Sequence, residues 1–99
     1  MYKHILSTMQ LNVQAGRIIM TNHAVREMKN DSLTFKDVIH SILTSEIVEQ
    51  QYDPDHKEYK YILSGDTLDG DEAGVVAKLG VNDTVVITVY RLGVDDYDY

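Results

Sequence analysis

Apolar residues in the first half of the chain recur every three or four positions, which is the period of an amphipathic helix. The clearest run is in 34–45, where the spacing i, i+3, i+4, i+7 and i+8 is occupied by Phe35, Val38, Ile39, Ile42 and Leu43. Thr34, with Asp37 three residues later, imitates a capping box in which Asp replaces the usual Glu or Gln. We therefore predict a helix here whose apolar face lies in the core.

Two more helices are expected before this one. Residues 2–15 place apolar side chains on one face, and Gly16 should close that helix. Thr21 or Asn22 can cap a second helix that runs to about Asn30, because either side chain accepts a hydrogen bond from a backbone N–H. Between the two helices, residues 17–20 favour a short strand.

After Ser45 the period changes from helix to strand. Strand-like runs separated by turn residues cover 47–51, 59–64, 74–79 and 84–91. Helices followed by strands indicate an α+β fold, with N-terminal helices packed on one face of an antiparallel sheet of about four main strands. In the last strand side chains alternate, so we assign Val85, Ile87 and Val89 to the helix-covered core and Thr88 and Tyr90 to the other face.

The length of 99 residues and the hydrophobic content of 43% fit one globular domain. We expect a single domain over 1–92, including the amphipathic N-terminal helix, and an acidic tail over 93–99. The chain has no cysteine, which excludes disulfides and thiolate metal sites. No apolar run approaches the roughly 18 residues that span a membrane, and the N-terminus does not resemble a signal peptide, so a cytoplasmic protein is expected.

The net charge of −7 is concentrated in two segments. They carry seven carboxylates, four in a predicted loop and three in the tail: Asp66, Asp69, Asp71, Glu72, Asp95, Asp96 and Asp98. Acidity in such segments is most simply a solubility feature. It could also repel nucleic acid or attract a basic partner.

The four histidines fall on different predicted elements and lack metal-ligand spacing: His4, His23, His40 and His56. His40 lies off the apolar helix face, and His56 lies in an acidic turn. The loop 66–72 lacks the ligand pattern of an EF-hand. We therefore predict no metal site and no cofactor.

His23 differs from the others because it stands at a predicted helix start, where the helix dipole disfavours a cation. A neutral imidazole there could accept a proton near neutral pH. Arg26 and Glu27 lie three and four residues further on and can both reach it. His23 is either a packed residue oriented by Glu27 or a functional group.

A series of segments from 17 to 91 carries a family resemblance. It begins with the sequence T-N-H-A-V-R-E-M (21–28), continues through the helix 34–45, S-E-I-V-E (45–49) and Y-I-L-S-G (61–65) before an Asp-Gly turn, and ends with V-V-I-T-V-Y-R (85–91). In this order the segments resemble a small bacterial domain-of-unknown-function family, common in cyanobacteria, whose members look like RelE/MqsR-type toxins. Genes of that family often stand beside a gene for a zinc-ribbon antitoxin.

The resemblance implies a toxin of a toxin–antitoxin pair, a metal-independent endoribonuclease that cleaves messenger RNA and is neutralised by an antitoxin. It suggests His23 as base or acid and Tyr90 as proton donor or phosphate ligand. Phosphate-binding cations would come from three residues: Lys60, Lys78 and Arg91. Family members often have a histidine where this chain has Gly74, which removes one acid–base group. The alternatives are a non-catalytic protein-interaction module and a homodimer that retain the toxin-like fold.

Overall fold

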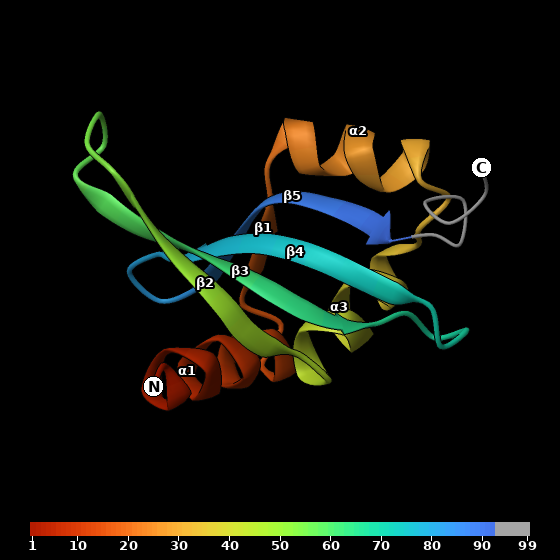
Figure 1. Ribbon diagram of the computed structural model, residues 1–99, viewed down its shortest axis with the longest axis horizontal. Helices are drawn as coiled ribbons and strands as arrows, with labels where there is room; N and C mark the ends of the chain where they lie inside the picture. The colour runs from red at the N-terminus through yellow and green to blue at the C-terminus, as the bar shows by residue number, and fades with distance from the viewer. Residues whose placement is uncertain (93–99) are drawn as a thin grey trace.

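The computed structural model describes residues 1–92 and has an α+β fold (Figure 1). The elements, in chain order, are α1 (Lys3–Gln14), β1 (Ile18–Met20), α2 (Asn22–Asn30), α3 (Phe35–Leu43), β2 (Glu46–Asp53), β3 (Glu58–Asp66), β4 (Glu72–Leu79) and β5 (Thr84–Leu92). The predicted tail, 93–99, lies outside the described residues. No helix within 1–92 combines the length and apolar character that crossing a membrane requires.

The five strands form one sheet in the order β1-β5-β4-β3-β2. Strands β2 to β5 pair antiparallel, as predicted, but the short β1 joins the sheet and runs parallel to β5. The predicted antiparallel pairing therefore holds for β2 to β5, but the sheet as a whole is mixed and has five strands instead of about four. Two residues after α1, Gly16 adopts a φ of +78°, which glycine takes readily, and the chain then continues into β1 beside β5.

The helix starts follow from the residues that precede them. Thr34 accepts a hydrogen bond from the backbone N–H of Asp37, and Asp37 accepts one from the backbone N–H of Thr34, so the predicted capping box is confirmed. Thr21 caps α2 by accepting from the backbone N–H of Ala24. Its own hydroxyl donates to the carbonyl of Ile87, which fixes the start of α2 against β5.

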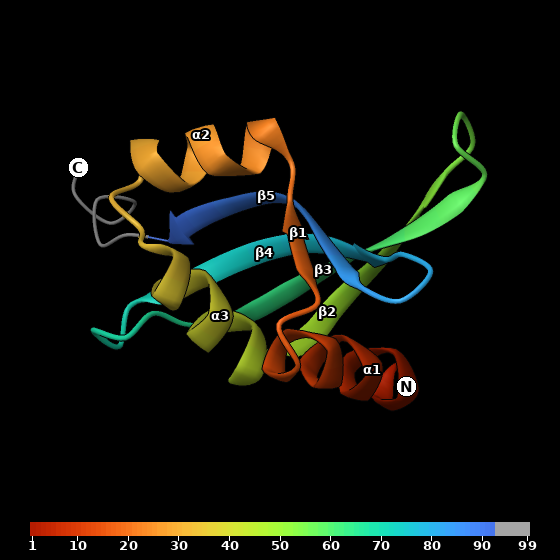
Figure 2. The same cartoon turned by 180° about the vertical axis from the view of Figure 1, so that it is seen from behind.

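The helices leave one face of the sheet open. Figure 2 shows α3 in front of the sheet with α1 beside it, whereas α2 runs along the β5 edge beyond the point where β1 ends. The buried core lies on the helix side. Its fully buried members include Met9 and Ile42 from the helices and Leu63, Val75, Val86 and Val89 from the sheet.

The assignment of faces along β5 was correct for Val89 and wrong for Val85 and Ile87. The pairing of β4 with β5 shifts between Val76 and Ala77, whose partners are Thr88 and Val86. Ile87 is thus an extra residue in a β-bulge, which reverses the alternation of side chains along the strand. As a result Val86 is fully buried, and Val85 and Ile87 are only partly buried.

Candidate functional site

The open face of the sheet presents a row of residues in register across three strands. Ser64 of β3, Gly74 of β4 and Tyr90 of β5 are paired in this row. A Cβ atom at Gly74 would overlap the ring of Tyr90, so the ring lies across the glycine. Position 74 is therefore covered by an aromatic side chain in this chain.

A small charged pocket of about 210 Å³ lies further along this face. Its lining comes from the start of α2, the β2–β3 hairpin, β4 and β5: Thr21, Asp53, His56, Glu58, Lys60, Lys78, Val85 and Ile87. The last two are the residues that the β5 bulge keeps out of the core. Five of the eight side chains are ionisable, so this is the part of the described chain where charged groups from several elements meet in one concavity.

Asp53 is the centre of the hydrogen bonds in this pocket. Its Oδ1 accepts from the backbone N–H groups of Asp55 and His56, at 3.0 and 3.3 Å. Its Oδ2 lies 2.8 Å from Nδ1 of His56 and 3.3 Å from Nζ of Lys60. The hydrogen bond from the His56 ring is the main cause that lowers the pKa of Asp53 to about 2.

The ionised Asp53 orients the His56 ring. A carboxylate can only accept hydrogen bonds, so Nδ1 of His56 is the donor, and in the neutral form of the ring Nε2 is the proton acceptor. The ring itself is well exposed, at 70% of its side-chain surface, so Nε2 is accessible to a ligand. The pair has the orientation that a general base requires.

The two lysines come from neighbouring strands and each has a carboxylate partner. Lys60 of β3 faces Asp53, and Nζ of Lys78 of β4 lies 2.6 Å from Oε2 of Glu58. Both lysine side chains remain about 30% exposed. With the two carboxylates balancing the two ammonium groups, the pocket is formally neutral apart from His56.

The structure brings together only some of the residues that the sequence suggested. Lys60 and Lys78 do meet in one pocket. Tyr90 lies on the same face, but five residues along β5 from Val85, roughly 15 Å at the usual strand rise. His23 is exposed in the first turn of α2, two residues after Thr21. Within the described chain, no hydrogen bond or ion pair joins His23 to the expected orienting residues, Arg26 and Glu27.

Arg91 does not join the lysines. Its backbone N–H donates to the carboxylate of Asp31, and its guanidinium donates to the carbonyls of Asp31 and Ser32 and to the carboxylate of Asp71. These bonds hold the α2–α3 connection and the β3–β4 loop against the end of β5. In this structure Arg91 therefore stabilises the packing of these loops and is not a free phosphate-binding cation.

His56 and Asp53 were missed at the sequence level because each was treated as part of a polar turn. The available signal was their spacing, since an Asp three residues before a His at a hairpin turn can accept from both the backbone and the ring. No three histidine or carboxylate side chains within 1–92 gather closely enough to hold a metal ion.

One comparison with known proteins gives a match. The family described as "Domain of unknown function (DUF4258)" matches residues 20–91. No curated protein and no solved structure matches the chain. The matched range begins just before α2 and includes all the residues of the charged pocket.

Proposed function

Since the chain belongs to DUF4258, a family of domains of unknown function, we propose an activity from its charged pocket: metal-independent cleavage of single-stranded RNA. The observation that carries this proposal is the meeting of the His56–Asp53 pair with Lys60 and Lys78 in one open pocket. The resemblance of the sequence to RelE/MqsR-type toxins supports the same class of reaction. It adds the proposal that an antitoxin, of zinc-ribbon type, restrains the enzyme.

The proposed reaction needs a base, a cation and an acid. Nε2 of His56 takes the proton of a ribose 2′-hydroxyl, whose oxygen attacks the adjacent phosphorus. Lys60 and Lys78 stabilise the added negative charge on the phosphate. The bond to the 5′-oxygen breaks, that oxygen takes a proton from a lysine ammonium, and the products end in a 2′,3′-cyclic phosphate and a 5′-hydroxyl.

The existing ion pairs are compatible with binding of a phosphate. Ion pairs on an exposed surface are weak, so a phosphate oxygen can replace Glu58 beside Lys78 at little cost. Asp53 would keep its hydrogen bond to His56 during this exchange. Binding should therefore weaken only modestly as salt increases, because the salt dependence grows with the number of cations that contact phosphate and this pocket supplies two lysines.

His23 and Tyr90 are retained as proposed further groups in catalysis. His23 lies two residues after Thr21, which caps α2 and lines the pocket. Tyr90 is further along the open face and would contact a flanking nucleotide. Arg26 and Glu27 would act only through His23.

The test uses purified full-length protein and a fluorescent single-stranded RNA in EDTA. We expect cleavage with cyclic-phosphate products and none with an RNA that has 2′-O-methyl groups throughout. His56→Ala should lower the rate by about 10²- to 10⁴-fold, the usual contribution of an acid–base group. Lys78→Gln should weaken binding of the RNA and also lower kcat, because the ammonium group is proposed to act on the charge that develops in the transition state.

His4→Ala is the matched control, because His4 is an exposed histidine on α1 far from the pocket. If His23→Ala and Tyr90→Phe abolish cleavage while His56→Ala does not, the reaction occurs elsewhere on the open face. RNA that stays intact with and without ribosomes would contradict the proposal.

A second function, the binding of another polypeptide, is favoured by the free edge of β2. This strand is the last of the sheet, is exposed along most of its length, and carries the exposed Val48 and Tyr52. Such an edge can pair with a second copy of the chain or with an extended partner. Light scattering should then show a dimer that Val48→Lys dissociates, and a monomer at all concentrations would leave only a foreign partner for this edge.

A further inference from the structure

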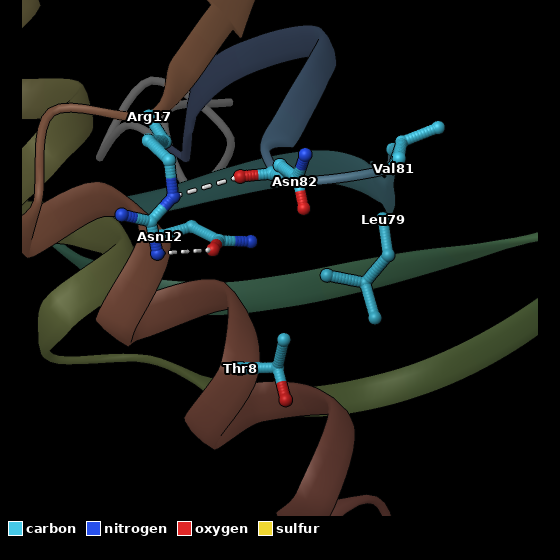
Figure 3. Close-up of a pocket in the computed structure, with 7 residues that line it drawn as sticks. Thr8, Asn12, Arg17, Leu79, Val81 and Asn82 are labelled. Atoms are coloured by element: carbon cyan, nitrogen blue, oxygen red, sulfur yellow. Dashed lines mark hydrogen bonds between the residues drawn. The ribbon is translucent and has the colours of Figure 1, made fainter.

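A second pocket, of about 590 Å³, lies outside the charged pocket, between α1, the turn after it and the β4–β5 hairpin (Figure 3). Figure 3 shows Arg17 and Asn12 on one side of this pocket and Leu79 and Val81 on the other. No carboxylate lines it, although the chain as a whole is acidic. Its formal charge is therefore +1, from Arg17.

The guanidinium of Arg17 is held by neutral groups. Its Nε donates to the backbone carbonyl of Asn82 at 2.8 Å, and its Nη2 donates to the side-chain carbonyl of Asn12 at 3.2 Å (Figure 3). Two of its five N–H groups are used in this way. Within residues 1–92 Arg17 forms no ion pair, whereas Lys60, Lys78 and Arg91 each face a carboxylate. The guanidinium of Arg17 is thus oriented by two hydrogen bonds without an ion-pair partner within 1–92, and the nearby carboxylate of Asp83 lies against Gly80 of the same hairpin.

Asn12 is buried, at 6% exposure, and a chain of hydrogen bonds sets its orientation. Its amide nitrogen donates to the hydroxyl of Thr84, and that hydroxyl donates to the carbonyl of Met9. The amide oxygen must therefore face Arg17. This arrangement orders the guanidinium before any ligand arrives, which reduces the entropy lost on binding.

The opposite side of the pocket is apolar. Leu79 packs partly against the core, and Val81, which is 96% exposed, lies at the rim of the pocket. The hydroxyl of Thr8 donates to the carbonyl of His4 on its own helix, so it is already used. A ligand here meets a cation and an amide at one end and hydrocarbon at the other.

We propose that this pocket binds an aliphatic monocarboxylate, either a free acid or the C-terminal carboxylate of a peptide that ends in Leu or Val. The planar guanidinium matches a carboxylate, and the single positive charge matches a monoanion. A phosphate dianion would need a second cation, and none lines the pocket. This site is independent of the proposed cleavage of RNA.

The test is an NMR titration of the ¹⁵N-labelled full chain with 4-methylpentanoate. We expect saturable shifts at Asn12, Arg17 and Asn82, and binding of the neutral 4-methylpentanamide to be weaker by about tenfold or more, the loss expected for a charge-assisted hydrogen bond. Arg17→Gln should weaken binding of the acid by a similar factor.

Val81→Glu tests the pocket without touching the network, because Val81 is almost fully exposed. The added carboxylate should repel the ligand, whereas Val81→Gln and the distant Arg26→Gln should bind as the parent chain does. The proposal is overturned if the amide binds as well as the acid, or if Val81→Glu binds unchanged. The latter test holds even if Arg17→Gln fails to fold.

The source of the carboxylate is decided by two peptides that end in Leu, one with a free and one with an amidated C-terminus. Tighter binding of the free peptide than of 4-methylpentanoate assigns the pocket to chain termini. Equal or tighter binding of the small acid assigns it to a free metabolite.

Discussion

The two ends of strand β3 have opposite surroundings. At the end near Gly65, α3 lies so close that a Cβ atom at this glycine would overlap the carbonyl oxygen of Ser41. The hydroxyls of Ser41 and Thr44 bond to the backbone of Asp66 in the same region. At the other end, Tyr59 is exposed and Glu58 and Lys60 are half-buried, in the β2–β3 hairpin that Figure 1 shows extending beyond the helices.

Along this single strand, the residues at one end stabilise the fold, and those at the other end are available for binding or catalysis. Where α3 covers β3, packing leaves almost no freedom for a side chain to change. Where it does not, charged groups keep access to water and to ligands, and their interactions are individually weak. Substitutions at the covered end should therefore affect unfolding, and those at the free end should affect function.

The largest contrast is expected between two tyrosines of β3 that lie two residues apart. Tyr61 is 6% exposed, packs edge-to-face against Tyr2 and accepts a hydrogen bond from Gln50, whereas Tyr59 is 51% exposed. Tyr61→Ala should lower the free energy of unfolding by about 4 kcal/mol, as for other large aromatic truncations. Tyr59→Ala should cost under about 1 kcal/mol. Urea denaturation measures both, and similar losses would remove the distinction between the two ends.

Gly65→Ala should follow, with a loss of about 3 kcal/mol, because the obstructing atom belongs to the α3 backbone and cannot rotate away. For a domain of this size the Tm should fall by roughly 12 °C or more. Ser64→Ala, at the adjacent residue on the open face, is the control and should change little. A loss below about 1 kcal/mol for Gly65→Ala would mean that α3 can move away from β3.

Asp37→Asn should cost about 2 kcal/mol, since an amide nitrogen would replace an oxygen that accepts from Thr34 or from the backbone of Leu68. The backbone hydrogen bond from Thr34 is the main cause that lowers the pKa of Asp37. Its stabilisation is present above the unfolded pKa of about 3.9 and is lost as pH falls through the lower folded pKa.

The stability gap between the parent chain and Asp37→Asn should therefore narrow in acid, in chemical denaturation measured as a function of pH. Lys36→Ala, an exposed neighbour, should show no such narrowing. A gap that is constant down to about pH 2 would show that the charge of Asp37 contributes nothing.

The smallest effect on stability is expected at Asp53. Its pKa is lowered to about 2, chiefly by the His56 ring, so its contribution is present above the unfolded value of about 3.9 and is lost as pH falls towards about 2. NMR should show the amides of Asp55 and His56 titrating with that low midpoint, while the core signals stay unchanged. Asp53→Asn should remove this titration and slow the proposed cleavage of RNA, because Nδ1 of His56 would lose its fixed proton.

The sequence predicted the elements well because their signals are local. The period of apolar residues and the capping box predicted the helix around Val38 and Ile42. The β-branched runs between turns predicted the strands. The parallel pairing of β1 could not be predicted in this way, since Ile18 and Thr84 meet only after the whole domain has closed. The bulge at Ile87 could not be predicted either, because residue types alone do not show which residue of a strand is the extra one.

The same limit applies to the site. Alternation within each strand could not show whether Lys60 and Lys78 share a face of the sheet, whereas the observed register, with Tyr61 opposite Ala77, brings the two lysines together. His56 belongs to a turn whose direction depends on the twist of β2 and β3, which no local pattern describes. Arg91 was suggested as a free cation because nothing near it in sequence reveals that Asp31 and Asp71 approach it from two other loops.

The contact between Gly74 and Tyr90 constrains the order in which this surface could have evolved. With the ring of Tyr90 where it lies, a side chain at position 74 would overlap it, so a larger residue at 74 requires that the ring rotate away or be replaced. A lineage that places histidine at 74 must first move or replace the aromatic residue at 90. Relatives should therefore carry either a small residue at 74 with an aromatic ring at 90, or a larger residue at 74 without that ring. Mixed combinations should be rare intermediates.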